Sequence, residues 1–115
     1  MPPDRDWSLR VRDIVGAIDR IARYTDGMTQ EQFARDEKTV EAVCFALVVI
    51  GEAAARVSEE GQARAPEVPW RKMRGMRNVA VHEYFGLDVE TLWLTATRDV
   101  PALRPLLRSL LESGS

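Results

Sequence analysis

The amino-acid sequence predicts an all-α protein, an antiparallel helical bundle of four long helices plus one or two short ones. Apolar residues recur at intervals of three and four along nearly the whole chain, which is the spacing of amphipathic helices. No stretch alternates apolar and polar residues in the way a half-buried strand would. With 115 residues, 45% of them apolar, the chain can bury a core of its own, so we expect a single domain spanning residues 1–115.

The first long helix is predicted by an apolar stripe of about five turns. The members of this stripe are Trp7, Val11, Ile14, Val15, Ile18, Ile21 and Ala22. Asp6 is the predicted N-cap and Asp26-Gly27 the predicted stop, because a short acceptor side chain favours a helix start and glycine favours a helix end. A short helix is then expected from Thr29, where Gln32 would complete a capping box.

The longest predicted helix spans about Asp36 to Glu59. Its apolar seam consists of Val40, Val43, Leu47, Ile50 and Ala54, and the residues on its other sides that are also apolar are Cys44, Phe45, Ala46, Val48 and Val49. A helix that is apolar nearly all round must be covered on more than one side. Either it is a central core helix within the monomer, or a second copy of the protein covers part of it. Cys44 has no partner for a disulfide, so a buried thiol is expected.

The second half of the chain begins with a loop from Gln62 to Pro69. Pro69 suits the first position of a helix from Trp70 to Phe85, because its missing N–H costs nothing there, and Gly86 would end that helix. Asp88 is the predicted cap of a further helix. The apolar face of that helix would comprise Val89, Leu92, Trp93 and Ala96, and a last helix is expected from about Pro101 to Leu111.

The composition excludes several classes of protein. The net charge of −2 argues against a general nucleic-acid coat protein, which would normally be basic. The N-terminus is charged and lacks the apolar core of a signal peptide, so none is expected. The longest apolar run, Ala42 to Ile50, has nine residues, too few to span a membrane. We therefore expect a cytoplasmic protein. One histidine and one cysteine leave no metal-binding pattern, and no phosphate loop or dinucleotide fingerprint is present, so no metal or cofactor is expected.

The candidate site that these exclusions leave is a polar, cationic segment on the predicted Trp70–Phe85 helix. Its basic residues are Arg71, Lys72, Arg74 and Arg77, with no acidic residue among them. On one continuous helix, Arg77 and His82 lie about 140° apart, which the length of arginine can partly close. Gly75, in the middle, costs about 1 kcal/mol relative to alanine and would let another backbone approach closely. The plain alternatives are a surface histidine among solvated arginines, and a Tyr84 that packs against Trp93 or the loop.

The spacing Arg77-x4-His82-x-Tyr84 resembles the signature of the HEPN superfamily, and in particular of its HepT-like toxins. The resemblance extends to the flanking residues. These are Pro69-Trp70, Gly75-Met76-Arg77-Asn78, Trp93, and Ile50-Gly51-Glu52-Ala53 on the long helix. It covers the chain from about Trp7 to Leu111.

This resemblance implies a HEPN-like helical bundle that forms a homodimer and acts as a metal-independent endoribonuclease, the toxin of a type VII toxin–antitoxin system. It implies that Arg77 and His82 are catalytic, and that a minimal nucleotidyltransferase antitoxin of the MntA type silences the toxin by AMPylation of Tyr84. The residues expected to bind the RNA backbone are Arg71, Lys72, Arg74 and Asn78.

The chemistry is compatible with these roles. RNA cleavage without a metal needs a base for the 2′-hydroxyl, an acid for the leaving 5′-oxygen, and positive charge near the phosphate. Histidine can take either proton role near neutral pH, and arginine can grip two phosphate oxygens. A two-fold dimer would bring two copies of His82 and Arg77 together. Two other functions stay open: a catalytically inactive HEPN module that binds nucleotide or RNA, and a helical partner of a nucleotidyltransferase.

Overall fold

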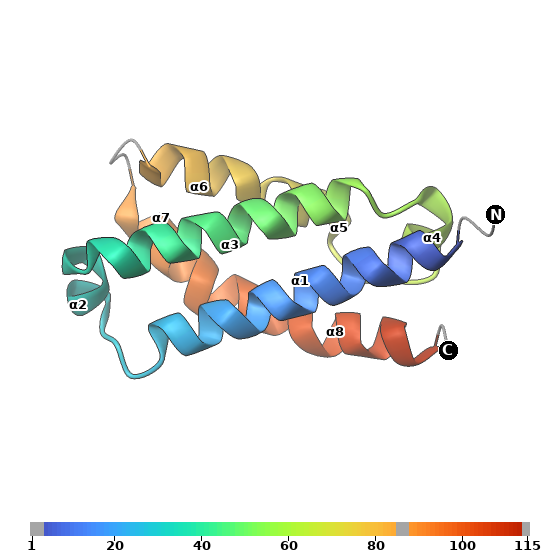
Figure 1. The fold of residues 1–115 in the computed structure, drawn as a ribbon, viewed down its shortest axis with the longest axis horizontal. Helices are drawn as coiled ribbons and strands as arrows, with labels where there is room; N and C mark the ends of the chain where they lie inside the picture. Colours follow the sequence, from blue (N-terminus) through green and yellow to red (C-terminus); the bar gives the residue numbers. More distant parts are fainter. Residues whose placement is uncertain (1–3, 85–87, 114–115) are drawn as a thin grey trace.

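A computed structural model describes the backbone of residues 4–84 and 88–113, and the side chains of residues 7–82 and 88–113 (Figure 1). Within these ranges the chain forms helices and loops and no strand, which confirms the all-α prediction. The helices are α1 (Asp4–Thr25), α2 (Gln30–Arg35), α3 (Glu37–Ala55), α4 (Glu59–Ala63), α5 (Trp70–Arg74), α6 (Met76–Tyr84), α7 (Val89–Leu94), the π-helical turn η1 (Thr95–Asp99) and α8 (Val100–Ser113).

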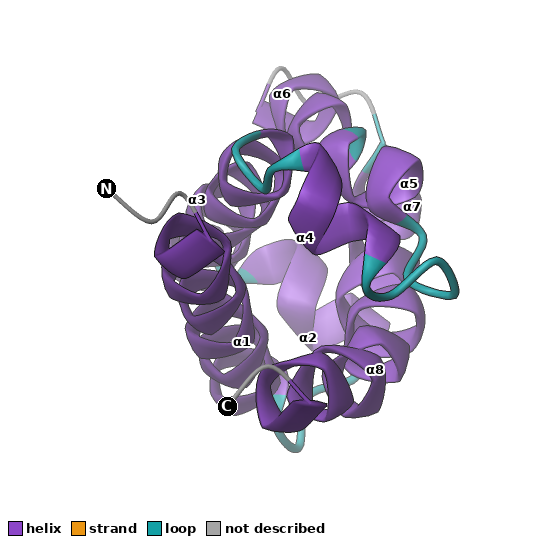
Figure 2. Cartoon of the chain, turned by 90° about the vertical axis from the view of Figure 1, so that its right-hand side faces the viewer, coloured by secondary structure: helices purple, strands orange, loops and turns teal. Residues whose placement is uncertain are grey.

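Helix α3 packs against α1 on one side and α6 on the other, and both neighbours run antiparallel to it (Figure 1). Helix α8 packs against α1, and the end-on view shows the long helices surrounding a common axis (Figure 2). The predicted seam of α3 faces this interior: Val43, Leu47, Ile50 and Ala54 are buried, and Val40 is partly buried. Cys44 is a buried thiol, as expected. The monomer therefore covers two sides of α3.

The first two helices follow their predicted signals with one exception. Gly27 adopts a left-handed conformation (φ 75°) just after α1 ends. Thr29 and Gln32 form the expected capping box, with hydrogen bonds of 3.1 and 3.0 Å. The prediction that Asp6 is the N-cap is wrong, because α1 already begins at Asp4. The backbone of Asp6 lies in the first turn of α1.

The long helix ends earlier than predicted, at Ala55 rather than Glu59. Ser58 begins a new helix, because its hydroxyl accepts a hydrogen bond from the Gly61 N–H at 3.1 Å and caps α4. The beginning of the expected Gln62–Pro69 loop is thus helical. Gly61 also touches α1: a Cβ added there would lie 2.7 Å from Cβ of Trp7.

The predicted helix from Trp70 to Phe85 is two helices, α5 and α6, separated at Gly75. The hydrogen bonds change at this residue. The Gly75 N–H donates to the Arg71 carbonyl, as in an α-helix, but the Gly75 carbonyl accepts the Asn78 N–H, which lies only three residues ahead. Pro69 stands immediately before α5, at its cap rather than at its first helical position. The predicted end at Phe85 and Gly86 lies outside the described residues.

Asp88 caps α7 as predicted, accepting the Thr91 N–H at 2.9 Å. Leu92 is buried, and Trp93 lies with its ring centroid 5.1 Å from that of Phe33 on α2. The two helices expected in this region are joined by η1, where the Val100 N–H reaches the Thr95 carbonyl. The four long runs of the predicted bundle are therefore α1, α3, α5–α6 and α7–η1–α8, while α2 and α4 are short.

Candidate functional site

The candidate site lies on α6, whose apolar residues pack it against the core. Met76 and Ala80 are four residues apart and both are buried. The opposite side of α6 is exposed. It carries Arg77, Asn78, Val81 and His82. The side chain of Tyr84, the last residue of α6, lies outside the described residues, so the expected modification site can be placed only by its backbone.

Gly51 on α3 sets how closely the start of α6 approaches. A Cβ added to Gly51 would lie 3.0 Å from Cβ of Arg77, 3.1 Å from the Arg77 nitrogen and 3.2 Å from the Arg74 carbonyl oxygen. The prediction that Gly75 would admit another backbone is wrong. The only described atoms within 4 Å of a Cβ at Gly75 are carbonyl oxygens of the preceding turn, at Lys72 and Arg71. The close contact between elements is made at Gly51.

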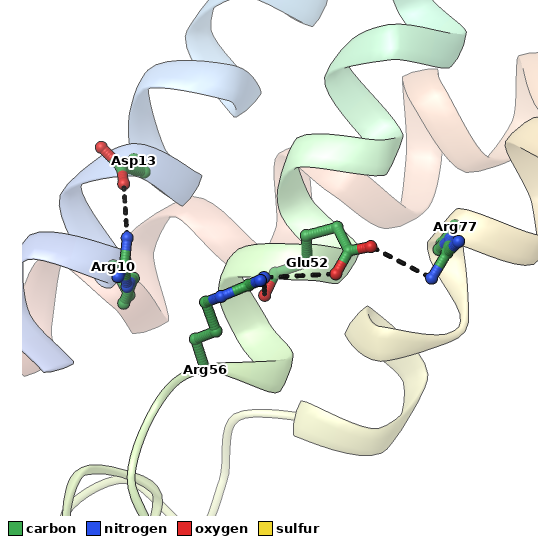
Figure 3. A network of polar contacts seen from close by, with 5 residues as sticks. All are labelled: Arg10, Asp13, Glu52, Arg56 and Arg77. Carbon is green, nitrogen blue, oxygen red and sulfur yellow. Dashed lines mark hydrogen bonds and ion pairs between the residues drawn. The ribbon is translucent and has the colours of Figure 1, made fainter.

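Arg77 forms an ion pair with Glu52, the residue after Gly51. Its Nη1 lies 3.0 Å from Oε1 of Glu52, while Oε2 of the same carboxylate lies 3.3 Å from Nη1 of Arg56. Figure 3 shows the two arginines reaching this carboxylate from α6 and from the end of α3. Glu52 and Arg77 are 41% and 59% exposed, so both keep access to solvent.

His82 lies on a different part of the exposed side. It lines a shallow hollow of about 230 Å³ together with Asn78, Val79, Asp88 and Thr91. Hydrogen bonds from the Thr91 hydroxyl and N–H hold the pKa of Asp88 below its ordinary value, and the nearby His82 acts in the same direction. Within the described residues no hydrogen bond or ion pair joins Arg77 to His82. Arg77 is not among the residues that line the hollow beside His82.

The predicted RNA-binding residues are exposed but do not form one uniform patch. Arg71, Lys72 and Arg74 are exposed on α5. Lys72 turns toward Asp99 of η1, at 3.8 Å, whereas Arg77 turns toward α3. Neither Arg71 nor Arg74 makes an ion pair with another described residue. Acidic partners that are remote in sequence therefore offset part of the positive charge.

An apolar hollow of about 310 Å³ lies between α3 and α6, next to the site. The residues that line it are Glu41, Cys44, Phe45, Val48, Ala80 and Val81. Phe45 is 68% exposed and Val81 is 45% exposed, and Val81 directly precedes His82. Two large apolar side chains thus remain in solvent beside the candidate site.

Sequence reasoning missed Glu52 and Arg56 as parts of this site. Glu52 belongs to the stretch that resembles HepT-like proteins, but nothing in the order of residues tells which cation a helical carboxylate will meet. Across the described ranges there is no group of three or more side chains suited to hold a metal ion. In the same ranges, none of the helices has the length and apolar character needed to cross a membrane.

Comparison with known proteins gives a consistent result. The model of a family described as "Ribonuclease HepT-like" matches residues 14–110. The "Probable ribonuclease HepT" of Thermococcus cleftensis is 42% identical over 94 residues, covering 82% of this chain and 86% of that protein. The "Putative RNase MJ0125" of Methanocaldococcus jannaschii is 31% identical over 110 residues, covering 96% and 95%. No solved structure matches the chain.

Proposed function

This chain belongs to the HepT-like ribonuclease family, and from that premise we propose that it is a metal-independent endoribonuclease that uses Arg77 and His82. One observation carries the assignment of these two residues. Both side chains are exposed on α6, a helix whose other side is anchored in the core by Met76 and Ala80. A rigid support with its polar groups in solvent can receive an RNA strand and hold its phosphate in a fixed place.

In the proposed reaction a base removes the proton of a 2′-hydroxyl, whose oxygen attacks the adjacent phosphorus. The bond to the 5′-oxygen breaks, and an acid protonates the leaving oxygen. The products are a 2′,3′-cyclic phosphate and a 5′-hydroxyl. His82 can take either proton role, while Arg77 stabilises the negative charge that collects on the phosphate oxygens.

We infer that the active form is a homodimer, with the site composed across the two-fold axis. One copy has one histidine, whereas the reaction needs both an acid and a base. The apolar hollow with Phe45 and Val81 supports a second copy at this place, because it adjoins His82 and leaves large apolar side chains uncovered. A symmetric pairing here would place two copies of His82 near each other.

We further propose that the protein is the toxin of a type VII toxin–antitoxin pair and acts in the cytoplasm. The inferred antitoxin is a minimal nucleotidyltransferase that adds AMP to Tyr84. The basis is the resemblance of Arg77-x4-His82-x-Tyr84 to the HepT-like signature. An AMP group near the end of α6 would bring a phosphate beside the exposed arginines and compete with RNA for them.

The test of the enzymatic proposal uses purified protein, total RNA and a chelator. The wild type should cleave RNA with chelator present, and His82→Ala and Arg77→Ala should each lower the rate by about 10²- to 10⁴-fold. Because both side chains are exposed, the free energy of unfolding should change by no more than about 0.5–1 kcal/mol. Arg35→Ala, at an exposed ion pair on α2, is the control. Undiminished cleavage by either variant would rule out the assignment of that residue.

A further inference from the structure

We propose that Glu52 is a positioning residue for Arg77, and that Arg56 keeps this pair cationic. The inference rests on the proposed function only in taking Arg77 as the group that meets an RNA phosphate. Glu52 would hold one edge of the Arg77 guanidinium, so that the remaining N–H groups face outward in a fixed direction. It would touch neither RNA nor the reacting atoms itself.

The first support is that α3 holds the backbone and the side chain of Arg77 with consecutive residues. Gly51 lets the Arg77 Cβ and nitrogen come within about 3 Å of where its own Cβ would be. The next residue, Glu52, forms an ion pair with Arg77, and its Oε1 lies 3.0 Å from Nη1 of Arg77. An arginine side chain otherwise samples many rotamers, and an ion pair at its far end, on a backbone that lies close to α3, narrows that choice.

The second support is the number of donors. A guanidinium has five N–H groups in a planar fork, and the contact with Glu52 uses Nη1 alone. The other nitrogens can still bind two oxygens of a phosphate. With Arg77 59% exposed, these nitrogens can be reached from solvent (Figure 3).

The third support is the charge balance at the carboxylate. A carboxylate alone beside Arg77 would cancel its charge and repel RNA. Here the second carboxylate oxygen of Glu52, Oε2, lies 3.3 Å from Nη1 of Arg56. The same Nη1 donates a hydrogen bond of 3.4 Å to the Glu52 carbonyl oxygen. Two arginines on one carboxylate leave a net charge of about +1. The group therefore stays attractive to a phosphate while its orientation is fixed.

The Glu52–Arg77 pair differs from another exposed ion pair of this chain in the elements that it joins. Arg35 and Glu31 form an exposed pair of similar length, 3.1 Å, but both lie on the six-residue helix α2, four residues apart. The Glu52–Arg77 pair joins two different helices and ends on a motif residue. Exposed pairs of either kind contribute little to stability, so removing one charge should leave the fold intact.

The experiment compares Glu52→Gln with Glu31→Gln, a matched control that makes the same change in the Arg35 pair. If Glu52 positions Arg77, Glu52→Gln should lower kcat about 10- to 100-fold, as a misplaced group does. Its KM should stay equal or fall, because a negative charge near the RNA is lost. Glu31→Gln should behave as the wild type in both constants.

Arg56→Gln provides a second, opposite signature. It leaves Glu52 paired with Arg77 but removes the charge that offsets the carboxylate, so KM should rise while kcat changes little. If Glu52→Gln kept its kcat, or gained activity, the positioning role would be overturned, since Glu52 would then be neutral or a repelling charge.

A spectroscopic measurement keeps the inference separate from the proposed ribonuclease activity. In ¹⁵N NMR the Nε–H signal of Arg77, identified by its loss in Arg77→Lys, should report a restricted guanidinium in the wild type and in Glu31→Gln. In Glu52→Gln the signal should become that of a mobile arginine.

A 2′-deoxy oligonucleotide, which cannot be cleaved by this chemistry, should shift the wild-type signal. If the protein cleaves no RNA but these shifts occur, the proposed function fails and the positioning stands. If Arg77 is equally mobile in wild type and Glu52→Gln, the positioning role is overturned.

Discussion

At the scale of single residues, the part that each basic side chain can play depends on the acidic side chain with which it pairs. Arg77 is paired with Glu52, Lys72 lies near Asp99, and the exposed Arg71 has no ion-pair partner among the described residues. Long-range attraction of RNA would therefore depend most on the cations of α5 that have no ion-pair partner among the described residues, whereas Arg77 would serve a local contact. This attraction should weaken as salt rises, because exposed charges are screened.

Tyr84 is the residue whose modification we expect to regulate RNA binding and cleavage. Coexpression with a nucleotidyltransferase partner should add one or more AMP groups to the protein, and Tyr84→Phe should receive none, because it keeps the ring but lacks the acceptor oxygen. Intact-protein mass spectrometry measures the additions directly. Modified protein should bind RNA more weakly, most clearly at low salt, since each AMP adds negative charge beside exposed arginines.

The control for this prediction is Tyr24→Phe, which alters the only other tyrosine and lies on α1. It should be modified as fully as the wild type. If Tyr84→Phe still gains AMP, another residue is the acceptor. If the partner neutralises Tyr84→Phe as well as the wild type, inhibition arises from complex formation alone.

At the scale of elements, the break at Gly75 separates two roles that one long helix would have combined. Helix α5 carries the exposed cations and packs by Trp70 and Met73, while α6 carries the motif. The start of α6 is seated on α3 at Gly51. The direction of the motif side chains is therefore set by the packing of α6 on α3 and not by continuity with α5.

Gly51→Ala tests this seating. The new methyl would lie 3.0–3.2 Å from Arg77 Cβ, the Arg77 nitrogen and the Arg74 carbonyl oxygen, two of which are backbone atoms that cannot rotate away. We expect a loss of about 1–3 kcal/mol in the free energy of unfolding, measured by urea denaturation, as for other overpacked contacts. Cleavage should fall as well, because the Glu52–Arg77 pair would be displaced.

The matched control is Gly16→Ala on α1, where, apart from the backbone of its own helix and its two chain neighbours, the new Cβ would meet only the flexible end of Arg20 among the described residues, at 3.6 Å. Alanine is the better helix former, so this variant should be as stable as the wild type or slightly more stable. Equal stability of Gly51→Ala and Gly16→Ala would show that α6 can move freely over α3.

At the scale of the whole molecule, the exposed apolar surface at Phe45 and Val81 predicts that two copies of the chain associate. The wild type should sediment as a dimer at micromolar concentration, and Phe45→Glu should sediment as a monomer, since it puts a charge into the apolar hollow. Leu9→Glu is the control, because Leu9 is also a large exposed apolar residue, 54% exposed, but lies on α1.

Cleavage should follow assembly if the site is composite. Phe45→Glu should keep its helical circular dichroism and lose ribonuclease activity, while Leu9→Glu keeps both. A wild type that remains a stable monomer would contradict the dimer, and an active monomeric Phe45→Glu would contradict the shared site. In the second case His82 of one chain would have to act without its symmetric copy.

The sequence by itself determined the features that depend on neighbours a few residues apart. The capping box at Thr29, the cap at Asp88 and the left-handed Gly27 are formed by hydrogen bonds or backbone angles within one turn. The helical class follows from apolar spacing, which is equally local. The HepT-like motif lies within one short segment of the chain, so the sequence is enough to identify the family.

Only the tertiary structure decided which distant groups meet. Gly61 of α4 fits against Trp7 of α1, and Gly51 rather than Gly75 admits a second backbone. The pairing of Glu52 with Arg77 has the same origin, since several carboxylates and arginines could pair on charge alone. Which pair forms depends on how α3 and α6 pack, and that packing is a property of the whole core, whose contacts join residues far apart in the chain.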